Sequence, residues 1–268
     1  MFPASTDSCR RTARADGVTM MIDPGLPTAA FIDVVASHGD FIDLVKFGWG
    51  TALVTRDLDR KVAVLRDAHI GCSFGGTLFE YFLWHDRLDD YLRLVDRTGT
   101  THIEVSNGTI PLDQHEKAEY VRRMSRVRPV LAEVGYKDAD RSDRFAPGQW
   151  VEAIREDLDA GARLVITETR ESGRSGIAAA DGSLRDDVLR AVLDAVDPAR
   201  LMFEAPTKEL QVEVINAVGP DANLGNIAAP DVLGLATLRR GLRADTLLSL
   251  ASPDPTPAPW EALHPTAV

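Results

Sequence analysis

Residues 41–50 read FIDLVKFGWG, a short apolar run that ends on Lys46 and then breaks into a turn with two glycines. Apolar runs that close on a charged or amide side chain recur at VTMMID (18–23), THIEVS (101–106), PVLAEV (129–134), RLVITE (163–168), LMFE (201–204) and ANLGN (222–226). Short apolar runs bounded by turns are typical of strands buried on both faces of a parallel sheet. The recurrence therefore predicts one large parallel sheet.

Segments with helical spacing separate these runs. We predict strands near 18–23, 41–46, 69–73, 101–106, 129–134, 163–168, 201–205 and 223–227. The helical segments lie at 28–39, 57–69, 79–99, 111–127, 148–162, 183–196, 208–219 and 229–248. Eight strand–helix units in 268 residues predict an α/β protein with one TIM-type (β/α)8 barrel, a fold of roughly 250 residues. The barrel domain is expected at 17–250, between a flexible arm at 1–16 and a proline-rich tail at 251–268.

Composition limits the partners. A net charge of −11 and a pI near 5.0 argue against nucleic-acid binding, which uses clustered Lys and Arg. No run approaches the ~20 apolar residues of a membrane span, and the first residues lack the apolar core of a secretory signal. Because the only cysteines are Cys9 and Cys72, we expect a reduced, cytoplasmic protein without membrane contact.

Charged side chains end several predicted strands. In such a barrel the carboxyl ends of the strands converge on one mouth, where active sites lie. The strand-end carboxylates are Asp23, Glu104, Glu133, Glu168 and Glu204. Gathered together they would repel one another, and a hard cation relieves this, so they are the candidate ligands of Mg²⁺ rather than zinc. The alternative is a ring of ion pairs with Lys46, Lys137, Arg170 or Lys208.

Acid–base chemistry is expected to fall to residues other than histidine. His69 and His102 open strands and so lie at the opposite end of the barrel from the mouth. Lys46 and Lys137, which end or follow strands, compete for the role of proton donor, and for each the alternative is a structural ion pair. Candidate anion-binding positions occur in glycine-bearing turns that follow strands, and they could equally be tight connections: Ser73, Gly75, Gly76, Gly225 and Asn226.

The chain resembles the phosphosulfolactate synthase family, which adds sulfite to phosphoenolpyruvate in one route towards coenzyme M. The resemblance spans about 17–246 and rests on blocks in order: GVTMMID (17–23), KFGWGT (46–51), GGTLFE (75–80), EVSNG (104–108), EVGYK (133–137), RESG (170–173), FEAP (203–206) and NLGNI (223–227). It implies a Mg²⁺-dependent homo-oligomer that acts on small anions, phosphoenolpyruvate and sulfite. It also implies an enediolate stabilised by the metal and protonated by Lys137, with Lys46, Arg170 and Lys208 binding substrate.

Two positions depart from the family pattern. Thr169 replaces an alanine, and Thr207 replaces a glutamine before Lys208. Both lie near the predicted mouth, so a related enzyme that uses a different nucleophile is an alternative. Because the family includes plant heat-stress proteins, a non-catalytic stress protein is a further alternative.

Overall fold

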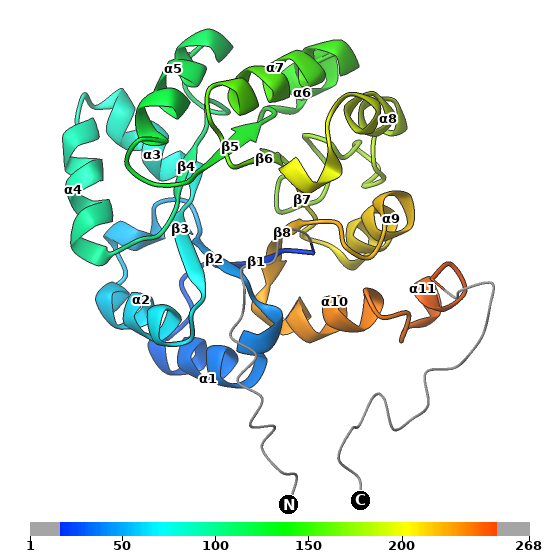
Figure 1. Ribbon diagram of the computed structural model, residues 1–268, viewed down its shortest axis with the longest axis horizontal. Helices are drawn as coiled ribbons and strands as arrows, with labels where there is room; N and C mark the ends of the chain where they lie inside the picture. The colour runs from blue at the N-terminus through cyan, green and yellow to red at the C-terminus, as the bar shows by residue number, and fades with distance from the viewer. Residues whose placement is uncertain (1–16, 251–268) are drawn as a thin grey trace, which may run out of the picture.

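The computed structural model describes residues 17–250 and contains eight parallel strands in one sheet, ordered β3-β2-β1-β8-β7-β6-β5-β4. The strands are β1 (Thr19–Asp23), β2 (Leu44–Phe47), β3 (Gly71–Phe74), β4 (Ile103–Val105), β5 (Val130–Val134), β6 (Leu164–Thr167), β7 (Leu201–Glu204) and β8 (Leu224–Ala228). The sheet curls into a barrel ringed by helices (Figure 1). The predicted fold and all eight predicted strands are confirmed, each within three residues at either end. Residues 1–16 and 251–268, predicted as arm and tail, lie outside the described part.

The barrel closes between β3 and β4 without a regular ladder. The backbone N–H groups of Thr101 and His102 both donate to the carbonyl of Cys72, at 3.1 and 2.9 Å. The Thr101 hydroxyl in turn accepts from the Cys72 N–H at 2.7 Å. Strand β4 is only three residues long and pairs in register with β5 alone. This seam is therefore the most thinly bonded part of the wall.

The helices surround the strands on the outside of the barrel (Figure 1). They are α1 (Thr28–His38), α2 (Leu58–Asp67), α3 (Gly76–Trp84), α4 (Leu88–Thr98), α5 (Gln114–Met124), α6 (Ala139–Arg144), α7 (Pro147–Asp159), α8 (Asp186–Ala195), α9 (Lys208–Val218), α10 (Val232–Leu238) and α11 (Ala244–Leu247). The single helix predicted at 79–99 is wrong: the chain turns between α3 and α4, where Asp86 has φ +52°. The short α6 was not predicted. Of the helices in residues 17–250, none has the length and apolar character needed to cross a bilayer.

The core has two parts that follow the alternation of side chains along each strand. A large cluster fills the space between strands and helices, and a small one fills the barrel interior with Val18, Met20, Leu44, Leu131, Leu164, Ile166 and Met202. Because successive strand residues face opposite sides, Lys46 faces inward with Leu44, and Glu133 faces inward with Leu131. The interior is thus apolar at its lower levels and charged at the mouth.

Candidate active site at the barrel mouth

A cavity of about 130 Å³ opens at the carboxyl ends of the strands. It is lined by Ile22, Lys46, Trp49, Gly75, Gly76, Thr77, Glu104, Glu133, Lys137, Glu168, Thr169, Arg170, Glu171, Glu204 and Asn226. Ten of these had been predicted as site residues from sequence: Lys46, Gly75, Gly76, Glu104, Glu133, Lys137, Glu168, Arg170, Glu204 and Asn226. No histidine is among the lining residues of the described chain.

Lys46 forms the floor of this cavity. Its Nζ lies 2.6 Å from Glu204 Oε1 and 3.6 Å from Glu104 Oε1, with all three side chains buried. Burial would lower the pKa of Lys46, but the charges of Glu104 and Glu204 outweigh burial and raise it above the ordinary value. Lys46 is therefore a permanent cation that joins β2 to β4 and β7.

Two backbone amides complete the partners of these glutamates. The N–H of Gly76, at the start of α3, donates to Glu104 Oε1 at 2.6 Å. The N–H of Thr169 donates to Glu204 Oε2 at 2.8 Å. The helix start that sequence offered as an anion site thus holds a carboxylate of the protein itself. A Cβ at Gly76 would lie 2.5 Å from Ser106 Oγ, so this position needs glycine.

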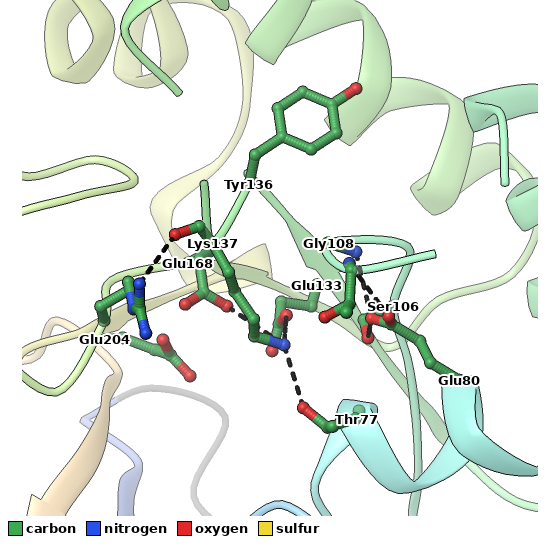
Figure 2. A network of polar contacts seen from close by, with 12 residues as sticks. Thr77, Glu80, Ser106, Gly108, Glu133, Tyr136, Lys137, Glu168 and Glu204 are labelled. Atoms are coloured by element: carbon green, nitrogen blue, oxygen red, sulfur yellow. Dashed lines mark hydrogen bonds and ion pairs between the residues drawn. The ribbon is translucent and has the colours of Figure 1, made fainter. Parts of the chain in front are cut away.

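Lys137 forms a second cluster nearer the opening. Its Nζ donates to Glu133 Oε1 and to Thr77 Oγ1, both at 3.2 Å, and lies 3.9 Å from Glu168 Oε2 (Figure 2). Burial would lower the pKa of Lys137, but Glu133 and Glu168 outweigh burial and raise it. The Lys137 side chain is 26% exposed, against 5% for Lys46. Of the two lysines, Lys137 is the more accessible to a ligand.

The glutamates differ in their affinity for protons. Burial, reinforced by Glu133 and Glu204, raises the pKa of Glu104 to about 7 although Lys46 opposes it. Burial and the charge of Glu133 raise the pKa of Glu168 well above its ordinary value. Burial also acts on Glu133, but Lys137 and a hydrogen bond from Glu168 outweigh it and lower the pKa of Glu133 to about 2. Glu168 therefore holds a proton more tightly than an ordinary glutamate and Glu133 less tightly, and Glu104 titrates near neutrality.

Three buried oxygen atoms around the cavity have no hydrogen-bond partner: Glu104 Oε2, Thr169 Oγ1 and Asn226 Oδ1. Buried polar atoms are normally paired, so unpaired ones grouped at one cavity indicate a ligand that supplies donors or a cation. Asn226 also has φ +56°, the left-handed region that asparagine tolerates better than most residues. Four buried glutamates and two lysines line the cavity, so carboxyl groups outnumber ammonium groups there.

These oxygens are suitable donors for Mg²⁺, which binds one or two protein carboxylates and keeps waters or substrate oxygens as its other ligands. Within residues 17–250 no three His, Cys, Asp or Glu side chains are arranged to hold a metal on their own. A site completed by substrate fits the unpaired oxygens better than a closed protein site would.

Four predicted residues lie off the cavity lining. Asp23 shares the outward side of β1 with Met21; its Oδ2 lies 2.6 Å from Lys61 Nζ, and its Oδ1 accepts from the N–H groups of Gly25 and Leu26. Lys208 pairs with Asp245 at 2.9 Å. Ser73 is buried on β3 beside Lys46. A Cβ at Gly225 would lie 2.9 Å from Met20 Cε, so this glycine makes room for the apolar interior.

Five lining residues were not among the predicted site residues: Ile22, Trp49, Thr77, Thr169 and Glu171. Thr77 binds the Lys137 ammonium, and the signal for it was available, since it directly follows Gly75 and Gly76 at a helix start. Thr169 was noted only as a departure from the family pattern, and its position in the cavity follows from the end of β6.

The chain is similar to proteins of known families over nearly its whole length. A model of the family described as (2R)-phospho-3-sulfolactate synthase (ComA) matches residues 8–245. A phosphosulfolactate synthase of Bacillus subtilis is 43% identical over 246 residues, covering 91% of this chain and 96% of the relative. Those of Methanothermobacter thermautotrophicus and Methanocaldococcus jannaschii are 39% and 38% identical and cover 87% and 86% of this chain, and 92% and 93% of the relatives.

Solved structures with low sequence identity share the fold. A 3-hexulose-6-phosphate synthase has a TM-score of 0.53 at 15% identity, covering 87% of this chain and 99% of that one. The YdjI aldolase from Escherichia coli K12 has a TM-score of 0.52 at 14% identity, covering 88% of this chain and 84% of that one. These likenesses support the barrel and say nothing of its chemistry.

Proposed function

Because the chain belongs to the (2R)-phospho-3-sulfolactate synthase family, we propose that it adds sulfite to the methylene carbon of phosphoenolpyruvate to give 2-phospho-3-sulfolactate. The observation that carries the proposal is a mouth cavity with a reachable ammonium group, Lys137, held between Thr77 and Glu133. In this addition a new carbon–sulfur bond forms at the methylene carbon, and electrons move onto the substrate carboxylate. The neighbouring carbon, which bears the phosphate, then takes a proton.

Lys137 is the proposed proton donor. Its neighbours raise its pKa, so it is charged at neutral pH and gives up its proton only to a strongly basic carbon. Glu168, whose raised pKa favours its protonated form, lies 3.9 Å from Lys137 Nζ and is placed to restore that proton. Glu133, which has a lowered pKa, orients the ammonium from the other side.

Lys46 and Arg170 are proposed to bind and position the substrates. Arg170 lies at the lip of the cavity, where its Nη1 donates to the Lys137 carbonyl at 3.3 Å. Its other nitrogens can bind a phosphate or carboxylate. Lys46, already paired with Glu104 and Glu204, holds the floor of the cavity in place.

Mg²⁺ is the proposed cofactor, because both substrates are anions and carboxyl groups outnumber ammonium groups in the inner cavity. Glu104 through Oε2 and Asn226 through Oδ1 are the protein ligands we propose first, since both atoms are buried without partners. Glu133, Glu168 and Glu204 complete the acidic surroundings. When bound, the ion would stabilise negative charge developing on the substrate carboxylate. We also propose a homo-oligomer in the cytoplasm, for which light scattering after size exclusion gives the subunit number.

Phosphorus NMR of the protein with phosphoenolpyruvate, sulfite and Mg²⁺ tests the proposal directly. We expect a new phosphate-ester signal that requires all three components and disappears with a metal chelator. Absence of that signal in the complete mixture contradicts synthase activity. A panel of thiols and oxyanions in place of sulfite tests the alternative nucleophile, which the unpaired Thr169 hydroxyl in the cavity favours.

Thermal unfolding with phosphoenolpyruvate and Mg²⁺ tests the non-catalytic alternative. A ligand that binds the folded state raises the unfolding temperature. Stabilisation without turnover would indicate a protein that has kept the site and lost the reaction.

A further inference from the structure

Behind the cavity lies a buried carboxylate that the proposed reaction does not use. Glu80 is on α3, and its side chain reaches the loop that follows β4, residues 106–110 (Figure 2). Glu80 Oε1 accepts from the hydroxyl of Ser106 and from the N–H of Gly108 at 3.1 Å. Oε2 accepts from the N–H groups of Thr109 at 2.9 Å and Ile110 at 3.1 Å.

This arrangement fixes the shape of the loop. Residues 106–110 have no helix or strand of their own, so their backbone N–H groups must find other partners. Three successive N–H groups converge on one carboxylate, the geometry of an anion-binding nest. Because Glu80 is buried, its charge is tolerable only with these donors, and the donors are satisfied only by Glu80.

The loop is also the wall beside Lys137. A Cβ built on Gly108 would lie 3.7 Å from Lys137 Cγ, 3.7 Å from Glu133 Oε1 and 3.4 Å from the Gly135 carbonyl. The loop backbone at Gly108 therefore lies beside the lysine stem and the carboxylate that the lysine binds, with space for little more than a methyl group between them. The same helix supplies Thr77, which accepts a hydrogen bond from Lys137 Nζ at 3.2 Å.

We propose that Glu80 is a positioning residue for Lys137: it clamps the 106–110 loop against the lysine and so holds the ammonium between Thr77 and Glu133. Glu80 does not line the cavity, so it does not contact substrate. The inference rests on the proposed function only for its kinetic readout.

Glu80→Gln tests the clamp, because glutamine keeps the size but turns an amide N–H₂ towards backbone N–H donors. We expect kcat to fall about 10- to 100-fold, since displacement of a reacting group by about 1 Å has this effect, with KM for phosphoenolpyruvate changed less than about threefold. Glu116→Gln is the matched control. Glu116 accepts from Asp113 N–H at the start of α5, at the far end of the same connection and away from the cavity.

Two readouts do not depend on turnover. Hydrogen exchange of the amides of 108–110 should accelerate at least tenfold in Glu80→Gln and not in Glu116→Gln. Acylation by an amine reagent, which needs the neutral amine, should accelerate about threefold or more at Lys137, relative to the exposed Lys208, as the contacts that hold the Lys137 ammonium loosen. If wild type makes no product, these two measurements still decide the positioning role separately from the proposed function.

A folded Glu80→Gln protein with kcat within twofold of wild type and unchanged Lys137 labelling overturns the proposal. A rise of about 10- to 100-fold in KM for phosphoenolpyruvate with constant kcat also overturns the proposal, because that pattern indicates lost substrate binding. If Glu80→Gln does not fold, Glu80→Asp, which keeps the charge but is one methylene shorter, takes its place with the same expected and contrary results.

Discussion

The molecule contains two kinds of buried lysine–carboxylate contact, and they differ in the ratio of cations to anions. Outside the barrel, Lys61 binds Asp23 at 2.6 Å and Lys117 binds Asp157 at 2.7 Å, one cation to one anion. Each of these lysines also donates to a backbone carbonyl, Lys61 to Leu26 at 2.6 Å and Lys117 to Glu133 at 2.8 Å. At the mouth, two lysines face four glutamates beside a cavity, and one glutamate oxygen has no partner.

The difference predicts which buried charges are structural and which are functional. A balanced buried pair joins two elements of the fold, and removing one partner leaves an uncompensated charge. An unbalanced cluster beside a cavity keeps perturbed protonation states and unpaired oxygens available for a ligand. We therefore expect the same residue types to respond differently to mutation. Mutations outside the barrel should lower stability, and mutations at its mouth should lower activity.

The largest expected effect is on turnover at the mouth. Lys137→Met should lower kcat by about 10²- to 10⁴-fold, the usual contribution of a general acid, with KM for phosphoenolpyruvate nearly unchanged. Steady-state kinetics measures this. Lys137→Arg is the control, because it keeps the positive charge but cannot readily give up a proton, so it should be similarly inactive. Near-normal turnover in Lys137→Met would remove Lys137 as donor.

Breaking a balanced pair outside the barrel should lower the stability of the protein. Lys61→Met leaves Asp23 buried with only its two backbone donors, so the free energy of unfolding should fall by about 3–5 kcal/mol. Chemical denaturation measures it, and kcat of the remaining folded enzyme should stay within about twofold. Lys208→Met, which breaks the exposed pair with Asp245, is the control and should hardly alter stability. A large activity loss in Lys61→Met without destabilisation would erase the distinction between the two kinds of contact.

The glutamates at the mouth should also make the free energy of unfolding depend on pH. Because the pKa of Glu104 is raised from 4.5 to about 7, the folded state binds this proton more tightly than the unfolded state does. Its contribution to stability is complete below pH 4.5 and is lost as pH rises towards 7, by roughly 3 kcal/mol.

Glu104→Gln should remove that part of the pH dependence in chelator-treated protein, as urea unfolding at several pH values would measure. Glu133→Gln is the control, because the pKa of Glu133 is shifted in the opposite direction to that of Glu104. Its pKa is lowered to about 2, so the Glu133 contribution is lost as pH falls from 4.5 towards 2. Identical slopes for wild type and Glu104→Gln between pH 4.5 and 7 would contradict the assignment.

The smallest effect is expected at Thr169. Its hydroxyl is buried without a partner, so Thr169→Val should keep or slightly raise stability, by up to about 1 kcal/mol. If the hydroxyl binds a substrate oxygen, KM for sulfite or phosphoenolpyruvate should rise about three- to tenfold. Thr169→Ser, which keeps the hydroxyl, should preserve KM. An unchanged KM in Thr169→Val would mean that the unpaired hydroxyl has no substrate partner.

Sequence was a good guide wherever strand periodicity decided the outcome. The apolar runs located all eight strands, and strand ends located Lys46 and the four glutamates. Asp23 also ends a strand, but it shares the outward side of β1 with Met21, whereas Ile22 lines the cavity. Met20, Met21 and Ile22 are all apolar, so alternation alone does not show which side of β1 faces the barrel interior.

Other features depend on contacts between distant segments. In the sequence, Lys61 and Lys117 look like ordinary lysines of predicted helices. Only the packed structure shows that both are fully buried against carboxylates. The bond from Gly76 N–H to Glu104 likewise joins segments 28 residues apart, which no local pattern encodes. Glu80 was part of a recognised block, yet its four donors come from a loop without regular structure.

The sparse hydrogen bonding between β3 and β4 affects how easily β4 can be displaced. Strand β4 is fastened in register on one flank only, and it carries Glu104, the carboxylate that titrates near neutrality and keeps one oxygen unpaired. A small displacement of β4 breaks few backbone hydrogen bonds on its β3 flank, so we expect Glu104 to be the most easily adjusted of the four glutamates when a ligand binds. The weakest lateral pairing of the barrel and the unpaired glutamate oxygen thus coincide on a single three-residue strand.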